Sequence, residues 1–241
     1  MPYVRDLSFG SLAPDSRAPN LLVGSGVEIH PTAQIGANVV IYDDVTIDAL
    51  AVVKHNCVIG ESPTLAIDTR AVPQPKVRTV IEAGAMICNG VVMISGCRIG
   101  SDTIIGDQSF VREGAVVAED CVIGRGCSIG VGASIGRGTK IQNNSIVMPG
   151  MVIEADVFIG AMLSGATDDS IGRDPDLAQQ AVTVRRGARI GSSVCLLPGI
   201  EIGEEAFIGA GAVVLDSVPP RAKVAGVPAR TIGVVADEET L

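Results

Sequence analysis

A six-residue period runs through most of this 241-residue chain and limits the folds open to it more than any other feature. An aliphatic residue recurs at every sixth position over 23–59, again over 81–159, and again over 184–214. All 27 of these leading residues are Ile, Val, Leu or Met, and the fourth position of each hexad is usually Gly, Asn or Asp. Because those three residues tolerate a positive φ, each hexad predicts a short strand followed by a tight turn.

The hexads are too short to bury an apolar side alone, but stacked hexads bury it together. With three faces per coil, the period predicts an all-β parallel solenoid of about nine coils, roughly 43 Å long at a strand spacing of about 4.8 Å. A narrow prism of this kind explains why aromatic residues are only 2 % of the chain and Gly is abundant. Four cysteines occupy the small fifth position, where we expect buried corner residues rather than catalytic groups or metal ligands: Cys57, Cys97, Cys121 and Cys127.

The charge balance excludes several classes of partner. The net charge is −9, from 18 Lys and Arg against 27 Asp and Glu, which disfavours nucleic acid as a ligand. A membrane-spanning helix needs about 18 consecutive apolar residues, and the sequence contains no such run. The first ten residues contain no apolar signal core. The six cysteines show no CxxC spacing, so we expect reduced thiols in a cytoplasmic protein.

The breaks in the period divide the chain. We expect an irregular N-terminal cap over 1–22, a β-helix over 23–218, and a closing segment with a tail over 219–241. Two protruding loops, 65–80 and 165–183, interrupt the β-helix. Long loops in a compact fold are usually functional or disordered, so both loops are candidates for covering a site.

The recurring string I-G-x-x-x-x-I-G, as in CVIGRGCSIGVGASIGRGTKI, resembles the repeat of the hexapeptide-repeat acyltransferases. The resemblance extends from residue 23 to about 218 and implies a left-handed parallel β-helix that forms a homotrimer. In character the chain is most similar to the sugar N-acetyltransferases of this family. The resemblance therefore implies a small-molecule amine or hydroxyl acceptor.

The segment IGAGAVVLDSVPPRAKVAGVPARTIG, 208–233, resembles the closing coil of CoA-dependent acetyltransferases. This implies acetyl-CoA or another acyl-CoA as co-substrate, with no metal required. By the same resemblance, the backbone of Ala210, Gly211 and Ala212 receives the pantetheine arm and adenine. The cations that would neutralise the CoA phosphates are Arg221, Lys223 and Arg230. The alternative is that the segment only caps the solenoid.

A histidine is the usual base for acyl transfer, and the chain has only two. His30 begins IHPTAQIG, which resembles the opening repeat of the family and is expected to be structural. His55 lies in VVKHNCVIGES, which resembles the signature around the catalytic histidine of related acetyltransferases, except that Asn56 replaces an acid. The hexad count places His55 about 30 Å from the closing coil, whereas an extended CoA arm reaches roughly 20 Å.

The same spacing favours the middle of the stack for catalysis. Glu113, in DQSFVREGAVV, lies about 19 Å from the closing coil and is a candidate base. Its segment weakly resembles one in nucleotide-linked 3-amino-dideoxysugar N-acyltransferases. The alternative is a solvated surface Glu.

Polar residues recur at the third position of every third hexad, provided that the first loop adds no hexad. This column predicts a hydrogen-bonded ladder, or else an ordinary solvated face, formed by His55, Asn89, Asp107, Arg125 and Asn143. Asp107 and Asn143 are further catalytic candidates, and Asn89 is a substrate-binding candidate. In the second loop, Asp168 and Asp169 match a substrate-binding stretch of the amino-sugar enzymes, or they serve only solubility.

These features favour an acyl-CoA-dependent acetyltransferase that N-acetylates an amino sugar, possibly a nucleotide-linked one. One alternative is an O-acetyltransferase acting on a small metabolite or antibiotic, and a different class is a non-catalytic β-helix scaffold. Two histidines cannot supply the three per zinc site of β-helical carbonic anhydrases. Residues 1–22 are too few for the α/β domain of sugar nucleotidyltransferases.

Overall fold

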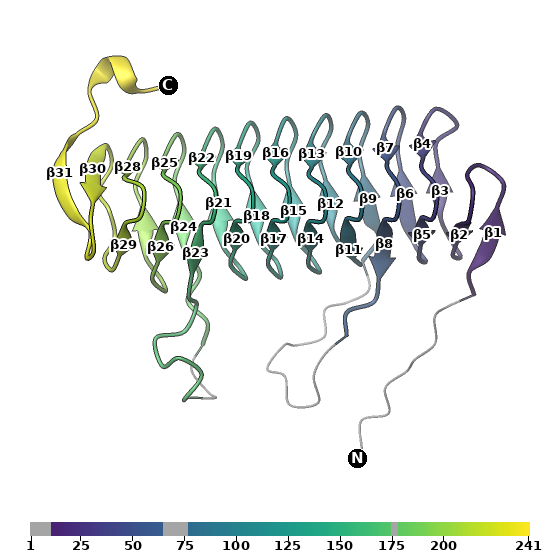
Figure 1. Cartoon of the computed structure of the whole chain (residues 1–241), viewed down its shortest axis with the longest axis horizontal. Helices are drawn as coiled ribbons and strands as arrows, with labels where there is room; N and C mark the ends of the chain where they lie inside the picture. The colour runs from purple at the N-terminus through teal and green to yellow at the C-terminus, as the bar shows by residue number, and fades with distance from the viewer. Residues whose placement is uncertain (1–10, 65–76, 175–177) are drawn as a thin grey trace.

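The computed structural model describes residues 11–64, 77–174 and 178–241, which form one column of stacked three-sided coils (Figure 1). Each face of the column consists of every third strand along the chain, paired in parallel with its neighbours. The chain therefore passes over the first, second and third faces in turn before it begins the next coil. This is the all-β parallel β-helix that the six-residue period predicts.

The strands are two to five residues long. The first face contains β2 (Leu21–Val23), β5 (Val40–Ile41), β8 (Val58–Glu61), β11 (Val92–Ile94), β14 (Phe110–Val111), β17 (Ser128–Ile129), β20 (Ile146–Val147), β23 (Ser164–Gly165), β26 (Cys195–Leu196) and β29 (Val213–Val214). The second face contains β3 (Glu28–Ile29), β6 (Val45–Ile47), β9 (Thr79–Ile81), β12 (Arg98–Ile99), β15 (Val116–Val117), β18 (Ser134–Ile135), β21 (Val152–Ile153), β24 (Thr183–Val184) and β27 (Glu201–Ile202). The third face contains β4 (Gln34–Ile35), β7 (Val52–Val53), β10 (Met86–Ile87), β13 (Ile104–Ile105), β16 (Val122–Ile123), β19 (Lys140–Ile141), β22 (Phe158–Ile159), β25 (Arg189–Ile190), β28 (Phe207–Ile208) and β30 (Ala222–Ala225).

Two antiparallel strands close the ends of the column. β1 (Ala13–Asp15) pairs with β2, so part of the expected irregular cap is a hairpin, while residues 1–10 lie outside the described part. At the other end β31 (Arg230–Val234) pairs with β30, and a 3₁₀ turn, η1 (Asp237–Glu239), follows. Both sheet ends are thereby covered by a strand of opposite direction (Figure 1).

The leading residues of the hexads point into the prism and form its core. Ile41, Ile123 and Ile208 are fully buried, as are the leading residues of most other coils. The four fifth-position cysteines are buried at the corners with them, which confirms their expected packing role. The turns follow the prediction too, because fourth-position residues such as Asn56 and Asp102 have positive φ.

The column has ten coils rather than the nine expected. The coil position of Gly165 does not follow the aliphatic period, because glycine replaces the usual aliphatic leading residue there. Val218, which bridges to Ile202, and Val224, which pairs with Ile208, also lie outside the phase of the period. These positions are fixed by backbone pairing, which does not depend on an aliphatic side chain or on a constant phase.

Both interruptions of the period leave the column at the same edge, between the first and second faces (Figure 1). Val53 pairs with Ile87, so the first interruption adds no hexad, as the predicted polar column requires. The expected loop 65–80 lies mostly outside the described residues, and its last two residues already belong to β9. Residues 165 and 183 likewise belong to β23 and β24.

Candidate active site

The edge between the third and first faces carries a single file of side chains, most of them polar, that ends in small residues toward the closing coil. Each member lies two residues beyond a leading residue of the third face, and the register from Val53 to Ile208 is continuous. We call this file the ladder edge. From the N-terminal side to the closing coil it consists of His55, Asn89, Asp107, Arg125, Asn143, Ala161, Ser192 and Ala210.

Side-chain hydrogen bonds join three pairs of neighbouring rungs on the ladder edge. The Oδ1 atom of Asn89 accepts the backbone N–H of His55 at 3.3 Å. Asp107 Oδ1 accepts both the backbone N–H and the side-chain amide of Asn89, at 2.8 and 3.0 Å. Asn143 Oδ1 accepts the backbone N–H of Arg125 at 3.0 Å. Three of the four steps in the predicted polar ladder are therefore hydrogen-bonded, while the step from Asp107 to Arg125 brings opposite charges together.

His55 takes part in this ladder through its ring. Its Nδ1 atom accepts the backbone N–H of Ala37 at 2.9 Å, and the residue is otherwise exposed. A ring nitrogen that accepts an N–H carries no proton, so the neutral imidazole holds its hydrogen on Nε2. The solvent-facing nitrogen is then a donor, which does not favour a role as general base. That role for His55 stays a prediction.

Asp107 presents an ionised carboxylate on the same edge. Hydrogen bonds from Asn89 hold the pKa of this carboxyl below its usual range, and the charges of Lys54 and Arg125 act in the same direction. The Arg125 guanidinium donates to Gln108 Oε1, with its Nη2 at 3.1 Å. The middle of the ladder edge therefore offers a fixed anion and a fixed cation to a polar ligand.

Glu113 lies on a different edge, between the first and second faces, and is only 4 % exposed. Arg112 binds it in a bidentate ion pair, with Nε 2.8 Å from Oε2 and Nη2 2.8 Å from Oε1. Burial raises the pKa of this carboxyl, but the ion pair outweighs burial and the net pKa is lowered. A carboxylate held in this way is a weak base, so the geometry does not favour the catalytic role predicted for Glu113.

The second-loop acids also lie away from the ladder edge. The carboxylate of Asp168 accepts the backbone N–H groups of Ser170 and Gly172, at 2.7 and 2.8 Å, and so shapes a turn. Asp169 belongs to the same turn segment, which starts from the edge that carries Glu113. The structure therefore groups Asp168 and Asp169 with the Glu113 edge. Their substrate-binding role stays a prediction.

The closing-coil residues predicted to receive CoA continue the ladder edge. Ala210 is its last rung, and the coils approach closely here, since a Cβ on Gly191 would lie 2.6 Å from the Ala210 nitrogen. Gly211 makes the following turn with φ of +71°. Ala212 is buried in the corner beyond it. The small residues of this coil thus leave the backbone near Ala210 open to a flat or extended ligand.

The extra hexad at Gly165 lengthens the column between the polar residues of the ladder edge and Ala210. It therefore changes which of these residues a CoA arm can reach. Asn143 lies three coils from Ala210, or about 14 Å, and Arg125 four coils, or about 19 Å. Asp107 lies at about 24 Å and His55 at about 34 Å on the same scale. A fully extended arm of roughly 20 Å from Ala210 would therefore reach Arg125, and a less extended arm would end beside Asn143.

The three cations predicted to bind CoA phosphates do not form one cluster. Arg221 forms an ion pair with Asp237, and Lys223 Nζ lies 2.7 Å from Glu239 Oε2. Arg230 instead donates to its neighbour's carbonyl, Ala229 O, at 2.7 Å. These partners do not follow from the six-residue period, although the acidic run near the C-terminus is a visible signal of them.

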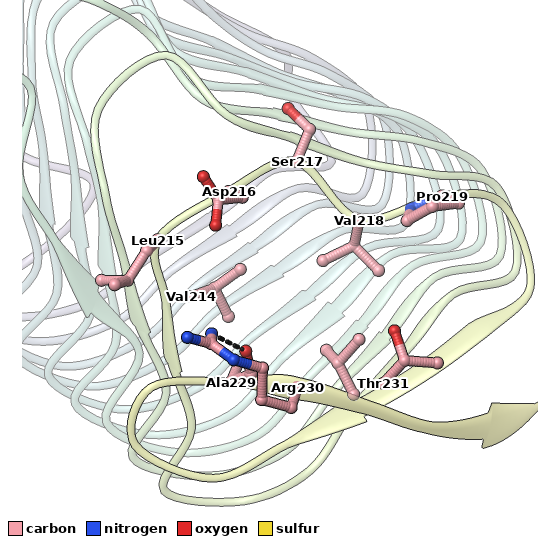
Figure 2. Close-up of a pocket in the computed structure, with 10 residues that line it drawn as sticks. Val214, Leu215, Asp216, Ser217, Val218, Pro219, Ala229, Arg230 and Thr231 are labelled. Carbon is pink, nitrogen blue, oxygen red and sulfur yellow. Dashed lines mark hydrogen bonds between the residues drawn. The ribbon is translucent and has the colours of Figure 1, made fainter.

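Arg230 lines a pocket of about 270 Å³ at the open end of the prism (Figure 2). Val214, Val218 and Val224 form its floor, and they are the last side chains of the core. The segment that includes Ala229 crosses over one side of this opening (Figure 2). The pocket is thus the end of the core under the closing strand and is separate from the ladder edge.

The repeat matches a known family. Residues 102–136 match the family model described as bacterial transferase hexapeptide (six repeats). This match confirms the hexapeptide-repeat resemblance seen in the sequence. No protein of curated function matches the chain in sequence.

Several solved structures are similar to this chain over part of its length. A hexapeptide-repeat acetyltransferase from Vibrio cholerae O1 biovar eltor, complexed with acetyl coenzyme A, is 24 % identical over 52 % of this chain and 72 % of its own, with a TM-score of 0.44. A galactoside acetyltransferase in complex with coenzyme A is 24 % identical over 54 % of this chain and 68 % of its own, with a TM-score of 0.46. The UDP-N-acetylglucosamine O-acyltransferase of Moraxella catarrhalis is 14 % identical over 92 % of this chain and 76 % of its own, with a TM-score of 0.44.

Within 11–64, 77–174 and 178–241, no helix has the length and apolar character needed to cross a membrane. The same residues contain no group of three or more His, Cys, Asp or Glu side chains placed to hold a metal ion.

Proposed function

We propose that this chain is a CoA-dependent acyltransferase that acetylates the amino group of an amino sugar, with nucleotide-linked sugars among the candidate acceptors. The observation that carries the proposal is that Ala210, in the CoA-like closing coil, and the polar rungs share one edge of the prism. A donor that is bound at the closing coil and extends along this edge would pass the small residues Ser192 and Ala161 and reach the hydrogen-bonding side chain of Asn143.

The proposed reaction takes place beside Asn143. Its Oδ1 atom is occupied by the Arg125 N–H, so the amide NH₂ group is the part that can donate to a thioester carbonyl oxygen. The acceptor amine attacks the carbonyl carbon and forms the C–N bond as the C–S bond breaks. The electron pair leaves on sulfur, and the proton lost by nitrogen passes to the thiolate or to water.

The acceptor sugar would lie further down the ladder edge. Asp107 lies two coils from Asn143 on the side away from the closing coil, a distance of about 10 Å. A sugar whose amine reacts beside Asn143 could place the hydroxyl groups on its opposite side near Asp107. The Asp107 carboxylate is ionised and can accept hydrogen bonds from hydroxyl groups, while Asn89 fixes its orientation. We assign Asp107 and Asn89 to acceptor binding rather than to proton transfer.

The state of the candidate bases supports an amine over a hydroxyl acceptor. A neutral amine already carries the lone pair that attacks, whereas a hydroxyl group needs a base to remove its proton. Of the two bases predicted from the sequence, His55 uses Nδ1 to accept a backbone N–H, and Glu113 is ion-paired on another edge. O-acetylation with His55 or Glu113 as the base would require the contact of that residue to break.

We also propose a homotrimer, as the resemblance implies. Its support is that apolar side chains stand exposed on the outer surface of all three faces: Phe110, Ile146, Val116, Val152, Ile104 and Phe158. Sedimentation equilibrium should then give three times the 24.7 kDa mass of the chain, and a monomer would contradict this. The six free cysteines fit a reducing compartment such as the cytoplasm.

An acceptor screen tests the proposed activity. The chain is incubated with acetyl-CoA and a panel of amino-sugar nucleotides, each paired with the sugar that has a hydroxyl in place of the amine, and released thiol is measured. Thiol release with the amines alone supports the proposal. Release with the hydroxyl sugars alone would overturn N-acetylation, and release with neither would favour a non-catalytic scaffold.

A further inference from the structure

A cationic patch lies on the outer surface of the third face at the end of the column. Register aligns Arg189, Phe207 and Lys223 on successive strands, and the Arg189 guanidinium lies 5.7 Å from the centre of the Phe207 ring. Arg221 lies just before Lys223 in the chain. We call Arg189, Arg221 and Lys223 the cationic patch.

The acidic end of the chain covers this patch. Val235 anchors it, because this side chain is buried, its N–H donates to Arg221 O at 2.7 Å, and its carbonyl accepts Arg221 Nη2 at 3.0 Å. Beyond the anchor, Asp237 pairs with Arg221 and Glu239 pairs with Lys223. Figure 1 shows this segment turning back from β31 above the preceding coils.

The acidic residues satisfy the patch only in part. Arg189 Nε and Nη2 and Arg221 Nε are buried and have no hydrogen-bond partner among the residues that the structure describes. The carboxylates of Asp237 and Glu239 thus lie against a patch of three cations. These buried guanidinium nitrogens of the patch still lack hydrogen-bond acceptors in the described part of the chain. Guanidinium groups pair in bidentate fashion with phosphate oxygens, so a phosphate ester offers the acceptors that the carboxylates do not.

The family resemblance already assigns Arg221 and Lys223 to CoA phosphates, and we propose that residues 236–241 act as an internal competitor for phosphate at the cationic patch. Both ion pairs that hold the segment include exposed side chains, and exposed pairs are weak, so an anion in solution can displace them. The Val235 anchor keeps the segment attached, which maintains a high local concentration of the competing carboxylates. Resting on the proposed function, we infer that the displacing ligand is the phosphate part of the acyl donor.

The charge on Glu239 agrees with this arrangement. The Lys223 side chain holds the pKa of the Glu239 carboxyl below its usual range, and the charge of Arg189 contributes in the same direction. The carboxylate is therefore ionised at neutral pH and responds to both the nearest and the more distant cation of the patch.

The test compares a double variant of the ion-paired acids with a single variant of an acid between them. In the double variant Asp237→Asn, Glu239→Gln the competing charges are removed while the chain length is kept. Glu238→Gln removes an exposed charge of the same segment for which the structure shows no ion pair. Binding of inorganic pyrophosphate is measured by calorimetry at low salt. Loss of two exposed ion pairs should tighten binding about three- to tenfold in the double variant and leave the Glu238→Gln variant close to the parent.

Acetyl-CoA in place of pyrophosphate separates this inference from the proposed function. Tighter binding of both ligands to the double variant supports both. Tighter binding of pyrophosphate, with no acetyl-CoA bound by any variant, keeps the phosphate site and overturns the CoA assignment. Equal or weaker pyrophosphate binding to the double variant than to Glu238→Gln would overturn the internal competitor, whatever acetyl-CoA does.

Discussion

Asn143 is held on the ladder edge by the backbone N–H of Arg125, 3.0 Å from its Oδ1 atom, and it lies three coils below Ala210. The contact fixes which end of the amide faces a ligand. Asn143→Asp should keep the accepted hydrogen bond and the fold but replace the donor with a negative charge. We expect kcat to fall about 10²- to 10³-fold, as when an oxyanion donor is removed. Steady-state kinetics with unchanged thermal unfolding would support this, and near-parental kcat would contradict it.

The contact between His55 and Ala37 predicts a structural role for the histidine. Asparagine accepts the same N–H at other rungs, so His55→Asn should retain activity and its pH profile. His55→Ala removes the acceptor and should lower the free energy of unfolding by about 0.5–1.5 kcal/mol. Denaturant unfolding and pH–rate profiles of both variants check this. A 100-fold loss of kcat in His55→Asn would show that the imidazole itself is catalytic.

The ion pair between Arg112 and Glu113 predicts a pH-dependent contribution to stability. The pKa of Glu113 is lower in the folded state than its ordinary value of 4.5, so the pair stabilises the fold above that pH and is lost as pH falls through the folded pKa. Glu113→Gln should therefore cost roughly 1–3 kcal/mol at pH 7 and much less near pH 3.

Glu119→Gln is a suitable control, because Glu119 is an exposed acid at the next edge of the same coil. Chemical unfolding of both variants at pH 7 and pH 3 gives the comparison. An equal loss for Glu113→Gln at the two pH values would contradict the ion-pair account. Turnover per folded molecule should be preserved in Glu113→Gln, whereas its abolition would restore the glutamate as a base.

The buried thiols predict low reactivity in the native state. Burial raises the pKa of Cys97 to about 12 and that of Cys121 to about 11, while Cys195 is partly exposed. A disulfide reagent at pH 8 should thus modify at most one thiol rapidly, and all six after unfolding in guanidinium chloride. Cys195→Ser should remove the rapid phase. Two or more rapid thiols in the native chain would show that the corners open.

Much of the fold follows from the period because each hexad repeats the same short strand and tight turn. Aliphatic leading residues such as Ile123 predict the core, and turn residues such as Asn56 predict the positive φ. The ladder edge was predictable for the same reason, because stacking places the third residue of one hexad next to the third residue of the hexad one coil away. The coil at Gly165 was missed because backbone pairing, rather than an aliphatic side chain, defines it.

The contacts of individual charges were not predictable in this way. Glu113 occupies an ordinary third position, and only the conformation of the adjacent Arg112 side chain ties up its carboxylate. The partners of Arg221 and Lys223 lie sixteen residues further on, outside the repeat. Such pairs depend on where an irregular segment returns to the column, which a six-residue period does not encode.

A crystal structure with bound acetyl-CoA tests the central claim most directly. The account predicts that the pantetheine arm follows the ladder edge from Ala210, with the thioester oxygen about 3 Å from the side-chain nitrogen of Asn143. An arm that follows the edge carrying Glu113, or a thioester bound away from Asn143, would contradict it.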